Sequence, residues 1–124
     1  MHEIDAIRRI FSEFPTSRLQ HLLRAQEEGR VIRSVYAGSI PGTGCILYQL
    51  NDTITSKPQR EKYFGSDPEL LEASLVTVQS WDTGRLSGAT LARVLRSEIA
   101  RRRELNAQED ATIKRVKAAR RCSV

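Results

Sequence analysis

The chain has 124 residues, of which 40% are hydrophobic and 28% charged, with a formal net charge of +5 at pH 7. This length and composition are typical of one soluble domain with a modest core, and they exclude wholesale disorder. No apolar run approaches the ~20 residues that cross a bilayer. The first ten residues mix acids and arginines into their apolar pattern, unlike a secretory signal. We therefore expect a cytoplasmic protein that makes no membrane contact.

Two helices are predicted at the start of the chain. Residues 2–14 carry apolar side chains at helical spacing, and Pro15 ends this helix. Ser17 and Gln20 then match the S-x-x-Q capping box, which predicts the start of a second helix, and Gly29 predicts its end. The expected buried residues are Ile4, Ile7, Ile10, Phe11 and Phe14 in the first helix and Leu19, Leu22 and Leu23 in the second.

Residues 30–50 leave two structures open. Residues 31–36 suit a short strand, and residues 38–44 must form a loop because they contain three glycines and a proline. Residues 45–50 then form either a short β-hairpin with 31–36 or a buried helical turn, and we favour the helix. Further on, residues 57–64 predict a short helix that Gly65 ends.

The central helix is predicted over residues 67–83. Asp67 is a good N-cap, Pro68 suits the first helical position, and Gly84 can take the left-handed conformation that ends a helix. We expect this helix to be buried through Leu71, Leu75 and Val78, with Leu70, Ala73 and Trp81 widening that face. We interpret Trp81 as a core residue and not as a ligand-stacking residue.

A last helix is predicted after Gly84, with Ser87 or Thr90 as its N-cap. Leu91, Val94, Leu95 and Ile99 form its apolar face, and Leu105, Ile113 and Val116 continue the same stripe if the helix runs unbroken to about Arg121. Alternatively, Asn106 and Glu109 cap a separate last helix. An unbroken helix would be too long to lie entirely on so small a core, so its end would project, fray or pack on a second subunit.

The basic charge is concentrated in the last third of the chain. Residues 85–124 carry eleven basic and four acidic residues, a net +7, whereas residues 34–84 have a net −3. A row of cations on a helix can contact the phosphates of nucleic acid without reading sequence. The candidate nucleic-acid-binding residues are Arg96, Arg101, Arg103, Lys114, Arg115, Lys117 and Arg121. Arg102 falls on the apolar stripe and is expected to make only an intrahelical salt bridge with Glu98.

The remaining motifs argue against catalysis. Gly38 and Gly44 have the glycine spacing of a phosphate-binding loop, but Cys45 and Ile46 replace the lysine and the hydroxyl residue that the chemistry needs. We interpret residues 37–45 as a glycine-rich connector. The histidines and cysteines lack metal-ligand spacing, and no nucleophile elbow is present. We expect no enzymatic activity, no cofactor and no metal.

These observations predict a mainly α protein of five or six helices, with a short β-hairpin in 31–50 as the alternative. Residues 1–100 would form the globular domain and residues 101–124 a basic helical extension. The function that we expect is a non-enzymatic binding or regulatory protein whose C-terminal helix contacts nucleic acid. The alternative is a protein-interaction module that docks on an acidic partner or on a second copy through this helix. An ordinary solvated helix face would explain the same charges.

Overall fold

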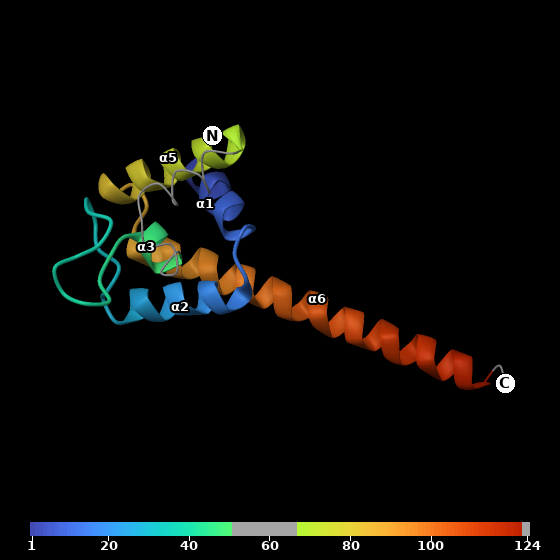
Figure 1. Ribbon diagram of the computed structural model, residues 1–124. Coiled ribbons are helices and arrows are strands. Elements are labelled where there is room, and N and C mark those ends of the chain that lie inside the picture. Colours follow the sequence, from blue (N-terminus) through green and yellow to red (C-terminus); the bar gives the residue numbers. More distant parts are fainter. Residues whose placement is uncertain (51–66, 123–124) are drawn as a thin grey trace.

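The computed structural model describes residues 1–50 and 67–122, and the described residues form five α-helices and no strand. The short helices and the first turns of the last helix surround a common core, and we call this part the body. The last helix projects far beyond the body (Figure 1). The predicted mainly helical fold is confirmed. The helix predicted over 57–64 lies outside the described residues.

Helices α1 (Glu3–Phe11) and α5 (Pro68–Asp82) pack against each other. Helix α1 buries Ile7, Ile10 and Phe11 completely, as its periodicity predicts. Asp67 caps α5 as predicted, because its carboxylate accepts hydrogen bonds from the amides of Glu69 and Leu70 at 2.9 and 3.2 Å. His2 caps α1 through Nδ1, which accepts from the Ile4 amide at 3.1 Å and was not predicted.

The predicted buried face of α5 is partly wrong: Leu70, Ala73 and Trp81 are buried as expected, but Val78 is only half-buried. Leu71 and Leu75 are 42% and 58% exposed. The buried side is mostly small and polar, and consists of Leu70, Ala73, Ser74, Thr77, Ser80 and Trp81. Small side chains let α1 approach closely, and α5 is apolar on both sides, so hydrophobic spacing alone could not choose between its faces.

Helix α2 (Thr16–Glu27) begins earlier than the capping box predicts. Pro15 is its N-cap and makes no side-chain hydrogen bond, so Ser17 lies inside the first turn instead of capping it. The Pro15 carbonyl accepts from the Arg18 amide at 3.0 Å. Gly29 ends the helix with a φ of +72°, as predicted. Helix α2 packs on α3 (Ile46–Leu50) and on the last helix.

The favoured helix in residues 45–50 is confirmed as α3, and the alternative β-hairpin does not form. Gly44 makes only isolated bridges, with Val31 and with Ala37. A Cβ atom at Gly44 would meet the ring of Tyr48, so glycine is required by the packing of this loop. The connector is organised by the side chain of Gln49 and not by a strand ladder.

Gln49 is 1% exposed and joins three segments. Its Nε2 donates to the carbonyls of Arg30 and Gly42 at 3.2 and 3.0 Å. Its Oε1 lies 3.0 Å from Nε2 of His21 in α2. The Gly44 amide also donates to the Arg30 carbonyl at 3.0 Å, so Gln49 adds a side-chain donor to the backbone hydrogen bonds of the loop.

Trp81 is a core residue, as predicted, with 3% exposure. Its indole N–H donates to the Ile32 carbonyl at 2.7 Å, and the Arg33 guanidinium lies 3.8 Å from the ring centroid. Arg33 also donates to the Leu86 carbonyl at 3.2 Å. These contacts hold the 30–44 loop to the turn after α5.

Helix α6 (Gly88–Cys122) is a single helix of 35 residues. Gly84 ends α5 with a φ of +80°, and the Ser87 hydroxyl accepts from the Thr90 amide at 3.1 Å. The chain beyond Gly88 has neither glycine nor proline, and the separate helix capped by Asn106 does not form. Its first turns bury Leu91, Leu95 and Ile99 in the body.

Candidate nucleic-acid interface

Arg102 anchors α6 at the point where it leaves the body. Its Nη1 and Nη2 donate to the carbonyls of Phe14 and Phe11, each at 2.8 Å. Its Nε donates to Glu98 at 2.9 Å, and Nη1 lies 3.3 Å from the Thr16 hydroxyl. The expectation of a simple intrahelical salt bridge is therefore incomplete. Arg102 joins α6 to the end of α1 and the start of α2.

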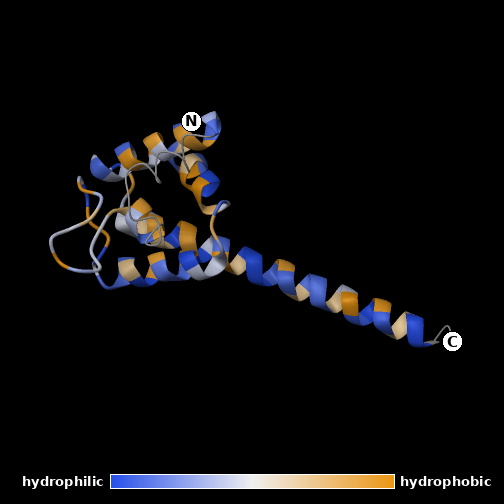
Figure 2. Cartoon of the chain, viewed as in Figure 1, coloured by the Kyte–Doolittle hydropathy of each residue, from blue (hydrophilic) through white to orange (hydrophobic). Residues whose placement is uncertain are grey.

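Every side chain from Arg103 to Arg121 is exposed. In Figure 1 this half of α6 extends away from the other described helices. Figure 2 shows that it is predominantly hydrophilic, with separate apolar positions along its length. The predicted binding residues beyond Arg102 therefore lie on a part of the helix whose side chains are accessible.

The projecting half has two distinct sides. At 100° per residue, Arg103, Lys114 and Arg121 lie within about 20° of one another, and Asp110 interrupts this row. We call Arg96, Arg103, Lys114, Lys117 and Arg121 the cationic row. The apolar stripe, formed by Leu105, Ile113 and Val116, is centred roughly 130° away around the helix. A ligand can thus contact one side while the other stays open.

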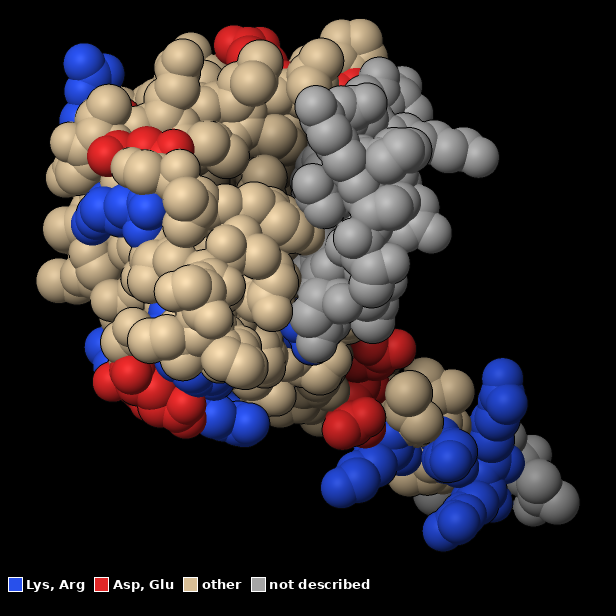
Figure 3. All heavy atoms as spheres, turned by 60° about the vertical axis from the view of Figure 1, so that its left-hand side comes forward, with Lys and Arg blue, Asp and Glu red and all other residues tan. Residues whose placement is uncertain are grey.

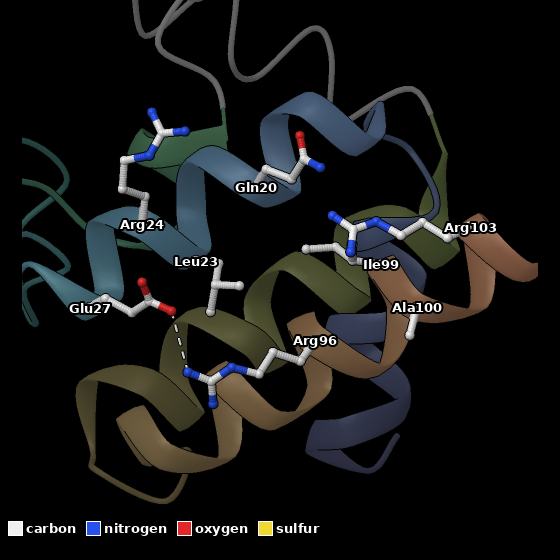
Figure 4. Close-up of a pocket in the computed structure, with 8 residues that line it drawn as sticks. All are labelled: Gln20, Leu23, Arg24, Glu27, Arg96, Ile99, Ala100 and Arg103. Atoms are coloured by element: carbon white, nitrogen blue, oxygen red, sulfur yellow. Dashed lines mark hydrogen bonds and ion pairs between the residues drawn. The ribbon is translucent and has the colours of Figure 1, made fainter.

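The body end of the cationic row borders a groove between α2 and α6. The groove has a volume of about 310 Å³ and is lined by Gln20, Leu23, Arg24, Glu27, Arg96, Ile99, Ala100 and Arg103. Figure 4 shows Leu23 and Ile99 pointing toward each other, with Arg96 and Glu27 at one end and Arg103 at the other. Nη2 of Arg96 lies 3.3 Å from the Glu27 carboxylate. The structure thus brings Arg96 and Arg103 together at one site.

Two of the predicted binding residues are not on this side. Arg101 forms two hydrogen bonds with Glu98, at 2.6 and 3.0 Å. The bond from Arg101 is the main reason that the pKa of Glu98 is lowered, and Glu98 in turn raises the pKa of Arg101. Arg115 lies on another side of α6, with Nη2 3.3 Å from the Thr112 hydroxyl. Neither extends the cationic row.

The far end of α6 holds the strongest concentration of positive charge. Figure 3 shows Lys and Arg side chains gathered there, whereas basic and acidic side chains are interspersed on the visible face of the body. The last nine residues of α6 include Lys114, Lys117 and Arg121 from the cationic row. Because no other described part of the chain lies beside them, their charges are open to an approaching polyanion.

Glu27 is the residue at this site that sequence reasoning missed. It belongs to α2, 69 residues away from Arg96 in the chain. No local pattern places α2 beside α6, so the sequence carries no signal for this pair. Arg24 also lines the groove, but its guanidinium points away from α6 in Figure 4.

In residues 1–50 and 67–122, no group of three or more His, Cys, Asp and Glu side chains could hold a metal ion. Cys45 is buried, and burial raises the pKa of its thiol, which disfavours a reactive thiolate. No helix within the described residues is long and apolar enough to cross a membrane.

Comparison with known proteins gives no relative for this chain: no family model, curated protein or solved structure matches it significantly.

Proposed function

We propose that this protein is a non-enzymatic nucleic-acid-binding protein whose cationic row contacts the phosphates of a duplex. The observation that carries the proposal is the charge of α6, which has ten basic and four acidic residues, and every side chain from Arg103 to Arg121 is exposed. Arg103 and Arg121 are separated by about 27 Å at 1.5 Å per residue. A straight cationic row of this length can follow several phosphates along a duplex.

The shape of the helix favours double-stranded DNA. The major groove of B-DNA admits an α-helix, whereas the major groove of A-form RNA is too narrow for side chains to read. Single-strand binding would need aromatic platforms for base stacking, and no aromatic residue follows Trp81. We therefore propose sequence-independent binding to duplex DNA.

Arg96 and Glu27 set the body end of this interface. Their side chains are 61% and 54% exposed, so the pair is accessible to water and contributes little to stability. A phosphate can therefore replace Glu27 as the partner of Arg96 at small cost. Arg103 lies at the opposite end of the same groove and would contact the next phosphate toward the projecting half.

The test is fluorescence anisotropy of a labelled 20-base-pair duplex with the full chain at several salt concentrations. The double variant Lys114→Gln/Arg121→Gln should lower the salt dependence of log K by about 1.8, since each lost phosphate contact contributes about 0.9. The matched control is Arg8→Gln/Arg85→Gln, which removes two exposed cations outside the row. The proposal fails if the wild type does not bind at low salt, or if both double variants weaken binding equally.

A further inference from the structure

The apolar stripe continues the side of α6 that packs in the body. Leu95 and Ile99 are buried on that side, and Arg102 follows them on the same side. Beyond this point Leu105, Ile113 and Val116 are 48%, 43% and 45% exposed. Duplex DNA on the cationic row would leave the stripe uncovered, because the two lie on different sides of the helix.

We propose that a second copy of this chain covers the apolar stripe, with the two α6 helices antiparallel. The inference goes beyond DNA binding, because the dimer would form without nucleic acid. In proteins the stability of a helix comes mainly from packing of an apolar side, and the exposed stripe of the projecting half has no such packing within the described residues. A second α6 supplies the same apolar side to each copy.

Charged residues select the antiparallel arrangement: at 100° per residue Glu109 and Arg120 lie within the stripe, and Asp110 and Lys117 lie beside it. In the antiparallel register that places Ile113 opposite Val116 of the second copy, Asp110 lies beside Lys117 of that copy. Glu109 then lies opposite Arg120 of the second copy. Two-fold symmetry repeats each of these oppositely charged pairs. In a parallel pair in register, each stripe residue would face the same residue of the second copy, so Glu109 would face Glu109 and the two carboxylates would repel each other.

This register also fits the shape of the molecule. Residues 104–122 form the projecting part, about 28 Å long, and each would lie along the corresponding part of the second copy. The two bodies would sit at opposite ends of the paired helices. Lys117 of each copy would pair with Asp110 across the dimer, whereas Arg103, Lys114 and Arg121 of each copy would stay exposed, so the dimer would present cations of two helices to DNA instead of one.

The test is sedimentation equilibrium of the full chain without nucleic acid, over a wide concentration range. Asp110→Lys and Lys117→Asp should each weaken dimerisation by about tenfold, because two exposed ion pairs are lost per dimer. The double variant Asp110→Lys/Lys117→Asp should restore the wild-type constant. Only the antiparallel register predicts this rescue, since the two side chains are far apart in a parallel pair.

Val116→Asp tests the stripe itself and should abolish the dimer, because it buries a charge in the pairing surface. Ala111→Asp is the matched control, since it adds the same charge on the opposite side of α6 and should leave the dimer intact. Circular dichroism shows whether each variant keeps its helix content. A monomer at every concentration would overturn the proposal, and so would a dimer that the double charge reversal fails to restore.

Discussion

Replacing Arg102 by alanine should destabilise the fold far more than an ordinary surface substitution. The guanidinium donates to the carbonyls of Phe11 and Phe14, and its side chain is only 17% exposed. The variant leaves two partly buried carbonyls without their charged donor and removes one of the two arginines from Glu98. Hydrogen bonds to charged groups contribute about 1.5–3 kcal/mol each, and water recovers part of the loss. We expect a loss of about 2–4 kcal/mol in the free energy of unfolding.

Trp81 is the single tryptophan and is buried, so its fluorescence reports unfolding directly. The Arg102→Ala variant should lower the urea midpoint by roughly 1–2 M. Arg101→Ala is the matched control, because Arg101 also bonds Glu98 but its side chain is 60% exposed. The control should lower the urea midpoint much less than Arg102→Ala does, because solvent screens an exposed ion pair. Equal losses for the two variants would refute the anchoring role of Arg102.

Three further substitutions test the packing and the electrostatics. Gly44→Ala should lower the free energy of unfolding in urea by about 1–3 kcal/mol, because its Cβ meets the Tyr48 ring. Gly29→Ala is the control: its Cβ meets open space, and the φ of +72° should cost only about 1 kcal/mol. Similar losses for the two variants would argue against the clash. The pKa of Glu98 is lower in the folded state than its usual 4.5, so its stabilising effect is present above that pH and is lost as the pH falls through the folded pKa. Unfolding between pH 7 and pH 3 should therefore show a smaller acid loss in Glu98→Gln than in the wild type, and identical pH profiles would contradict this. Thr77→Val should stabilise the fold by about 1 kcal/mol in thermal unfolding, since the buried Thr77 hydroxyl has no hydrogen-bond partner within the described residues. A destabilised variant would show that the hydroxyl makes a hydrogen bond in the folded protein.

The candidate interface was only partly predictable. The charge excess and the helical spacing of Arg103, Lys114 and Arg121 are local properties, and the structure keeps them on one side of one helix. The predicted binding residues include Arg101 and Arg115, because the charge excess alone does not show on which side of the helix each cation lies. The pairing of Arg96 with Glu27 depends on how α2 packs against α6, and no sequence pattern encodes that contact.

The sequence by itself determined where most helices begin and end, because caps and breakers act within one turn of the chain. Asp67 caps α5, Gly29 and Gly84 take left-handed conformations, and the absence of glycine and proline beyond Gly88 allows a helix of 35 residues. These effects need no partner from elsewhere in the fold.

Only the tertiary structure decided which surfaces meet. Helix α5 is apolar on two sides, and the close approach of α1 buries the side with small residues while Leu71 and Leu75 stay exposed. Arg102 lies on an apolar stripe by spacing, yet it bonds carbonyls about 90 residues earlier in the chain. Such choices depend on the shapes and the unsatisfied polar groups of distant segments, which a local pattern cannot contain.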